Sequence, residues 1–171
     1  MYVVDSASRV VNTRSVRRAL VILMATVTLV ALLPSSAAAL PTQPPVDVVV
    51  LNANYLDLDR DGMSDDVLSR FSVSVSSSVV FTTSYLYCFL EKPSGETHLY
   101  IIKVIGSYSK ITIDLGWFDG ANEKGWYWFY VYAEVIDRGY SRWDYDQLNF
   151  DPPTEGRPAP PRVDVLTWYV Q

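Results

Sequence analysis

Cysteine and histidine are almost absent from this chain of 171 residues, which has one of each. A single cysteine cannot form a disulfide within the chain, and one Cys with one His cannot assemble a zinc cluster. Basic residues are also in the minority, with 14 Lys and Arg against 19 Asp and Glu and a net charge of −5. Domains that bind nucleic acid present a basic face, so we expect no nucleic-acid partner.

Sequence motifs of common enzymes are missing as well. There is no G-x-S-x-G elbow for a nucleophilic serine, no phosphate-binding P-loop, no H-E-x-x-H and no dinucleotide fingerprint. The lone His98 therefore has no nucleophile motif to act with. Asp144 and Asp146 could form the carboxylate pair of a glycosidase, but their alternation with Trp143 and Tyr145 is typical of an exposed strand face. We predict a protein that is not an enzyme and has no catalytic residues.

One long apolar run is present, and it lies near the N-terminus. Arg14, Arg17 and Arg18 precede the run at 19–33, and Pro-Ser-Ser then leads to three alanines at 37–39. This order of basic, apolar and small residues is that of a secretory signal peptide, and the run is shorter than the about 20 residues of a spanning helix. We predict that residues 1–39 are a signal helix outside the fold, cleaved after Ala39, with an uncleaved N-terminal anchor as the alternative.

Removal of residues 1–39 would leave an acidic domain. That segment holds four Arg and one Asp, so the remaining 132 residues carry ten basic and eighteen acidic side chains, a net charge of −8. We expect this domain to be secreted or held at the cell surface, and to meet a membrane only through an uncleaved N-terminal segment.

The predicted domain reads as all-β. Residues 40–45 form a Pro-rich lead-in, and after it apolar and polar residues alternate in short segments that turn residues separate. No helical period appears outside the signal. Candidate strands are 46–56, 67–76, 79–91, 97–105, 109–115, 126–137, 140–149 and 162–170. This number and spacing predict a single antiparallel β-sandwich over 46–171, similar in general shape to immunoglobulin or fibronectin type III domains.

Aromatic residues crowd one predicted face. In segment 126–135 one alternating set reads as core, while Trp126, Trp128 and Tyr130 lie on the other side. If this strand pairs with 79–91, their aromatic faces form one patch that could bind a glycan or a protein on the cell exterior. The candidate binding surface comprises Trp117, Trp126, Trp128, Tyr130 and Trp143. The alternative is that neighbouring strands, or the C-terminal segment 163–170, cover these rings; that segment could also pair with a second copy of the chain.

The most informative stretch is the acidic sequence D-L-D-R-D-G-M-S-D-D at 57–66. Calcium takes about six to eight hard oxygen ligands, and alternating Asp residues in a tight loop can point several carboxylates inward. Gly62 stands where the chain must turn sharply. The candidate metal ligands are Asp57, Asp59, Asp61, the Met63 carbonyl and Asp65. The alternative is a solvated acidic turn, since Asp and Gly are common turn residues.

The D-x-D-x-D-G-x-x-D string resembles the calcium loops of EF-hands, dockerins and thrombospondin type 3 repeats. It is similar to loops in secreted prokaryotic β-domain proteins. The resemblance covers about ten residues and implies Ca²⁺ as the cofactor. It departs at the twelfth position, which is Leu68 rather than a bidentate Glu, and the flanking segments read as strands. A further ligand would then come from Asp66, from water or from a distant residue such as Asp151.

Together these patterns predict a non-catalytic secreted or cell-surface β-sandwich module that calcium stabilises and that serves adhesion or the binding of protein or glycan. A structural component of the cell envelope is the main alternative, in which the loop only rigidifies the sandwich. An exported glycan-active enzyme is a distant third.

Overall fold

The computed structural model describes residues 3–11, 46–75, 82–152 and 160–171, and all regular structure in these ranges is β-strand. The predicted apolar signal run, the cleavage site after Ala39 and the lead-in at 40–45 lie outside the described residues. Within the described ranges no helix has the length and hydropathy that crossing a bilayer requires.

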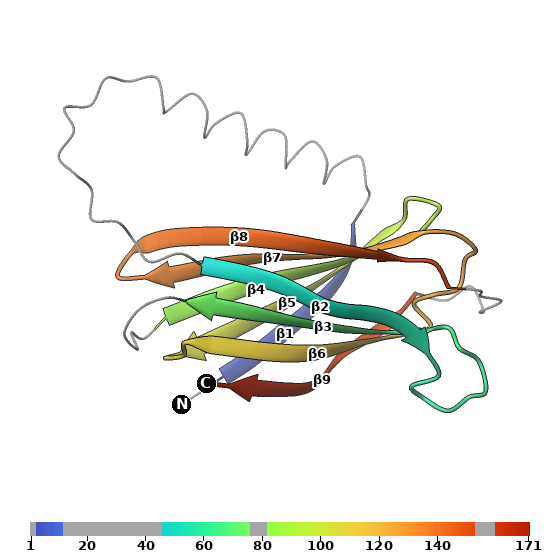
Figure 1. The fold of residues 1–171 in the computed structure, drawn as a ribbon, viewed down its shortest axis with the longest axis horizontal. Coiled ribbons are helices and arrows are strands. Elements are labelled where there is room, and N and C mark those ends of the chain that lie inside the picture. The colour runs from blue at the N-terminus through green and yellow to red at the C-terminus, as the bar shows by residue number, and fades with distance from the viewer. Residues whose placement is uncertain (1–2, 12–45, 76–81, 153–159) are drawn as a thin grey trace, which may run out of the picture.

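The described residues form nine strands in two antiparallel sheets that pack face to face (Figure 1). The strands are β1 (Val3–Val11), β2 (Val46–Leu56), β3 (Asp66–Val75), β4 (Thr82–Glu91), β5 (Thr97–Gly106), β6 (Lys110–Phe118), β7 (Tyr127–Asp137), β8 (Tyr140–Phe150) and β9 (Arg162–Val170). One sheet, called sheet A below, has the order β1-β5-β4-β7-β8, and sheet B has the order β2-β3-β6-β9. The predicted β-sandwich is therefore confirmed.

The strand order matches the immunoglobulin pattern at the level of the fold. If β2, β3 and β6 are equated with strands A, B and E, and β4, β7 and β8 with C, F and G, both sheets follow the immunoglobulin neighbours. The C-terminal β9 occupies the place beside E that strand D takes in that fold. All eight strands expected from the alternation are present, and most of their ends differ from the prediction by at most a few residues. Residue 76 of the expected strand 67–76 and residues 79–81 of the expected strand 79–91 lie outside the described residues.

The core lies between the sheets and is built from alternate residues of each strand. In β7 every second residue from Tyr127 to Val135 is fully buried, as the alternation predicts. Phe71 of β3 and Phe129 of β7 meet across the core with ring centroids 6.1 Å apart, and Trp117 of β6 meets Phe129 edge-on at 6.2 Å. Each such buried side chain contributes about 1.5–3 kcal/mol through removal of its apolar surface from water.

The segment Val3–Val11 differs from the expectation that residues 1–39 take no part in the fold. It forms β1 and pairs antiparallel with β5 over nine consecutive residue pairs, from Val3 opposite Ile105 to Val11 opposite Thr97. Without β1, strand β5 would be the edge of sheet A, and the unpaired N–H and C=O groups of an edge strand can pair with another extended segment. Cleavage after Ala39 stays a prediction, and it would remove this strand.

Candidate functional site

The acidic loop connects β2 to β3 and is held by hydrogen bonds from its own main chain. Asp61 N donates to Asp59 Oδ1 at 3.1 Å, Met63 N donates to Asp61 Oδ1 at 2.8 Å, and Gly62 N donates to Asp57 Oδ2 at 3.2 Å. Gly62 has a φ of +91°, which a residue with a Cβ rarely adopts, so the sharp turn expected at this glycine is present. Aspartates that accept main-chain N–H groups in this way build a tight turn.

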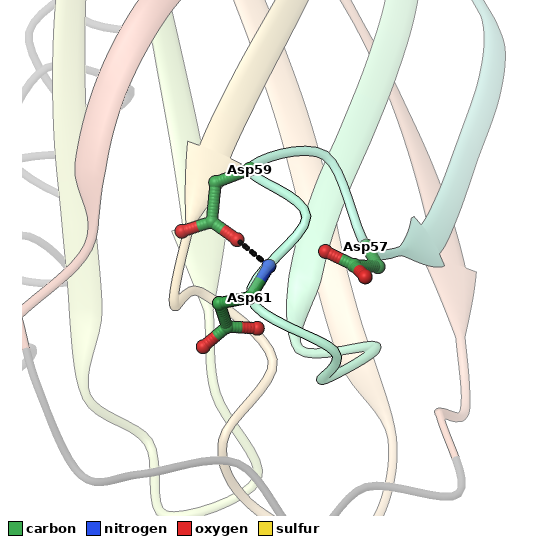
Figure 2. A group of neighbouring side chains, drawn as sticks. All are labelled: Asp57, Asp59 and Asp61. Atoms are coloured by element: carbon green, nitrogen blue, oxygen red, sulfur yellow. Dashed lines mark hydrogen bonds between the residues drawn. The ribbon is translucent and has the colours of Figure 1, made fainter.

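Three of the predicted ligands come together in this loop. Asp57, Asp59 and Asp61 each offer a carboxylate oxygen, and these oxygens lie within 4.8 Å of one another (Figure 2). Two unit negative charges at that distance repel by about 1 kcal/mol even with the dielectric constant of water. A divalent cation would replace this repulsion with attraction, and carboxylate oxygens are the ligands that Ca²⁺ prefers.

One carboxylate oxygen in the cluster is shielded from solvent and is better suited to contact a cation than to contact water. Asp57 Oδ1 is enclosed by protein and accepts no hydrogen bond from the described residues. Asp57 stands at the end of β2, whereas the other two carboxylates lie further around the exposed loop (Figure 2). An enclosed carboxylate oxygen carries a desolvation cost unless a proton donor or a cation faces it. The donor set therefore fits a hard divalent ion.

Asp66 has a different position from the three clustered aspartates. Its side chain is buried, and its carboxylate accepts main-chain N–H groups from three residues: Leu58 at 2.6 Å, Asp59 at 3.1 Å and Asp119 at 2.8 Å. Since both oxygens already accept hydrogen bonds, we do not include Asp66 in the proposed ligand set. Its contacts tie the acidic loop to the turn that follows β6.

The other predicted side-chain ligands, Asp65 and Asp151, are not part of this cluster among the described residues. Asp65 is buried, and its main-chain carbonyl accepts the N–H of Ala121 at 2.6 Å. Asp151 is exposed just after β8. Met63 is half-buried in the loop, where its carbonyl stays a predicted ligand. The structure thus brings together the first, third and fifth positions of the calcium-loop pattern, and the remaining positions stay predictions.

The predicted aromatic patch forms on the outer face of sheet A. Strands β4 and β7 pair as expected, which sets Tyr87 opposite Tyr132 and Phe89 opposite Tyr130. Tyr132 in turn stacks on Trp143 of β8 with centroids 5.7 Å apart, and Trp128 stacks on Tyr130 at 6.1 Å. We call this surface the aromatic face. It comprises Tyr85, Tyr87, Phe89, Trp128, Tyr130, Tyr132, Trp143 and Tyr145.

The candidate binding residues differ in how much of each side chain is exposed. Trp126, just before β7, is 58% exposed and Trp143 is 51% exposed, while Trp128 and Tyr130 are half-buried by their neighbours. Trp117 departs from the expectation, because it is fully buried in the core and its indole N–H donates to Ser69 Oγ at 3.1 Å. It lies on the side of β6 that faces the core, and the number of aromatic residues in a segment does not show which of them face the core. Trp117 therefore belongs to the packing of the sandwich and not to its surface.

Asp144 and Asp146 have partners that the sequence did not suggest. Their side chains point toward β2 of the other sheet, where Asp144 Oδ2 accepts the N–H of Val48 at 2.8 Å and Asp146 Oδ2 accepts the N–H of Val50 at 2.7 Å. These N–H groups lie on the edge of β2 that pairs with no strand among those described. The two carboxylates thus close one side of the sandwich, and their oxygens are engaged by main-chain donors.

A second charged group lies where the turn after β4 meets the turn before β7. The buried Lys92 ammonium pairs with Glu96 at 3.0 Å, and Ser94 donates its N–H and its hydroxyl to Glu123, each at 2.9 Å. The side chain of His98 is also buried, 3.6 Å from Glu96. Burial, and next the charge of Lys92, hold the pKa of His98 below its ordinary value.

Comparison with known proteins finds no match for this chain among family models, curated proteins or solved structures.

Proposed function

We propose that this protein is a non-catalytic, exported β-sandwich module that binds a neutral glycan through the aromatic face. The observation that carries the proposal is the exposure of large aromatic side chains on one side of one sheet: Trp143 is 51% and Tyr145 is 55% exposed on β8. Contiguous exposed apolar surface on a soluble domain usually marks a binding site.

The chemistry of the aromatic face supports a sugar ligand. Its rings offer apolar surface for the C–H faces of a pyranose, and its tyrosines add hydroxyl groups that donate and accept hydrogen bonds. Tyr130 shows this second property, because its hydroxyl donates to Glu91 at 3.0 Å. The net charge of −8 expected after cleavage disfavours acidic polymers. A protein partner is the other class that an aromatic surface could serve.

The acidic loop supports calcium as a structural partner of this module. The three clustered carboxylates and the enclosed Asp57 oxygen supply hard ligands, and Asp66 fixes the loop to the sandwich. We propose that Ca²⁺ binds here and rigidifies the connection between β2 and β3. The loop has no flanking helices, so an opening switch of the calmodulin kind is not proposed.

A glycan-active enzyme is less well supported than a binding module. The best candidate carboxylate pair, Asp144 and Asp146, accepts main-chain N–H groups from β2. A role as a structural component of the cell envelope remains the alternative proposal, and it would use the same calcium-stabilised sandwich without a ligand.

Affinity electrophoresis of the exported protein through gels of neutral polysaccharides tests the glycan proposal. Trp143→Ala should weaken retardation at least about tenfold in Kd, because truncation of a central interface Trp costs about 2 kcal/mol. Trp168→Ala is the matched control, since Trp168 is 43% exposed on the other sheet. Equal loss in both variants, or retention by none of the polysaccharides, would count against a glycan and leave a protein partner.

A further inference from the structure

The edges of the two sheets differ in how they are protected. An edge strand with free N–H and C=O groups tends to pair with another chain unless charges, bulges or covering segments prevent it. On one side of the sandwich, Asp144 and Asp146 of β8 accept the outward N–H groups of Val48 and Val50 on β2. Strand β2 also carries a bulge between Val50 and Asn52. The free edge of β2 therefore offers little to a further strand.

Strand β9 is protected in a different way. Its pairing with β6 shifts register between Asp114 and Leu115, which leaves Leu166 as the extra residue. Arg162 and Asp164 form an exposed ion pair of 3.2 Å near its start. A bulge twists the edge away from a flat partner, and edge charges oppose pairing with another chain.

Along the side that faces β1, strand β5 has neither a bulge nor an ion pair among the described residues. It contains no proline, and its pairing with β1 runs over nine residue pairs without a register shift. Its one Lys is Lys103, whose ammonium lies 5.6 Å from the ring centroid of Tyr85 on β4, on the side away from β1. Among the described strands, β1 is the element that covers this edge.

Strand β1 precedes the apolar run at 19–33, whereas β5 follows it. Cleavage after Ala39 would therefore remove β1 and open the edge of β5. We propose that in the cleaved protein this edge pairs antiparallel with β5 of a second copy, which joins two four-stranded sheets into one. The inference rests on the predicted cleavage and not on the glycan or calcium proposals.

A second copy fits this edge for geometric reasons. Strand β1 shows that the edge accepts a long antiparallel strand. A two-fold axis at Ile101 sets Lys103 of one copy opposite Leu99 of the other. An axis at Ile102 sets Lys103 opposite Ile101. In neither arrangement do the two lysines face each other. Such a contact is isologous and closes at two subunits. The axis would be perpendicular to the sheet, so both aromatic faces lie on the same side and offer a bivalent surface to a polymer.

The test uses the exported protein, purified after secretion with its own N-terminal segment and checked by N-terminal sequencing and mass. Sedimentation velocity should show a dimer in the product that begins at Leu40. Replacing both Leu99 and Ile101 by Lys should give a monomer. With the axis at either Ile101 or Ile102, an introduced lysine then faces Lys103 of the other copy, and like charges directly opposite each other destabilise the pairing. Leu51→Lys with Leu166→Lys is the matched control, since both leucines are exposed on other edge strands, and it should stay dimeric.

Two further measurements separate loss of pairing from loss of folding. Circular dichroism should be the same for the monomeric variant and the control. A peptide of residues 3–11 should convert the dimer to monomer, whereas a scrambled peptide should not. Hydrogen exchange of the β5 amides should slow as the concentration of unmodified protein rises.

Four results would overturn the proposal: a cleaved product that is monomeric at every concentration, a dimer that survives both lysines, a dimer that the 3–11 peptide leaves intact, or a secreted protein that still begins at Met1. Calcium-dependent melting of the monomeric variant reports separately on the calcium proposal. Polysaccharide binding is measured on the unmodified protein and on Trp143→Ala, because Leu99 and Ile101 lie opposite Phe89 and Tyr87 of the aromatic face.

Discussion

The main-chain N–H of Val48 on β2 donates a hydrogen bond of 2.8 Å to Asp144 Oδ2 on β8, which joins the two sheets between residues 96 positions apart. Asp146 repeats the contact two residues later with Val50 N. Alternation along β8 places both carboxylates on the same side of that strand, and alternation along β2 places both N–H groups on its free edge. Carboxylates here satisfy the donors of an edge strand, where a further strand would otherwise bind.

Removing either carboxylate should therefore destabilise the sandwich. Asp144→Ala and Asp146→Ala should each lower the free energy of unfolding by about 1–3 kcal/mol, because each leaves a main-chain donor without its charged acceptor. Urea denaturation followed by tryptophan fluorescence measures this. Gln147→Ala, an exposed neighbour on the opposite face of β8, should change stability little. Equal stability of all three variants would show that water replaces the carboxylates without cost.

Calcium should raise the melting temperature of the unmodified protein, and chelation should lower it. A ligand present at about 100 times its Kd adds about 2.7 kcal/mol to the free energy of unfolding. Combining Asp59→Ala with Asp61→Ala should abolish the calcium-dependent rise, whereas Asp47→Ala, an exposed acid on β2, should keep it. An equal calcium-dependent rise in the doubly substituted protein would place the ion elsewhere, and no rise in the unmodified protein would rule out the site.

Asp66 should behave differently from the clustered aspartates. Asp66→Asn should lower the free energy of unfolding by several times the contribution of one typical hydrogen bond, which is about 1 kcal/mol. The reason is that the buried carboxylate accepts hydrogen bonds from three main-chain donors. The loss should be the same with calcium and with chelator. Asp59→Ala should destabilise mainly when calcium is present. Thermal melts of both variants in the two conditions distinguish a residue that holds the loop from a residue that binds the ion.

Stability should fall as the pH drops below the ordinary pKa of histidine, about 6.5. The pKa of His98 is lower in the folded state than in the unfolded state, mainly because of burial and next because of Lys92. The unfolded chain therefore binds a proton first, and stability is lost between the unfolded and the folded pKa. His98→Gln should flatten the dependence of the urea midpoint on pH in that window. An unchanged slope in this variant would show that other groups cause the loss.

Local pattern was sufficient for the eight strands after residue 45 and for the turn of the acidic loop, but not for β1. Burial on one side of a strand repeats every second residue, so the alternation in 126–135 already separated Phe129 and Val131 from Trp128 and Tyr130. The D-x-D-x-D-G spacing likewise places Asp57, Asp59 and Asp61 on one tight turn. Both patterns depend only on residues that are close together in the chain, so they can be recognised in the sequence.

Long-range packing decided what the sequence left open. Trp117 and Trp143 look alike as aromatic residues in alternating strands, yet one is fully buried and the other half exposed. Which side of a strand is covered depends on the sheet that packs against it, and that sheet is formed by distant segments. The same holds for Asp144, whose donor lies on β2, and for β1, whose pairing with β5 joins residues far apart in the chain. The sequence by itself determined where eight of the nine described strands and the acidic turn lie. Only the tertiary structure decided that Val3–Val11 is a strand and which faces and edges stay free, because burial and edge pairing are set by segments that meet from distant parts of the chain.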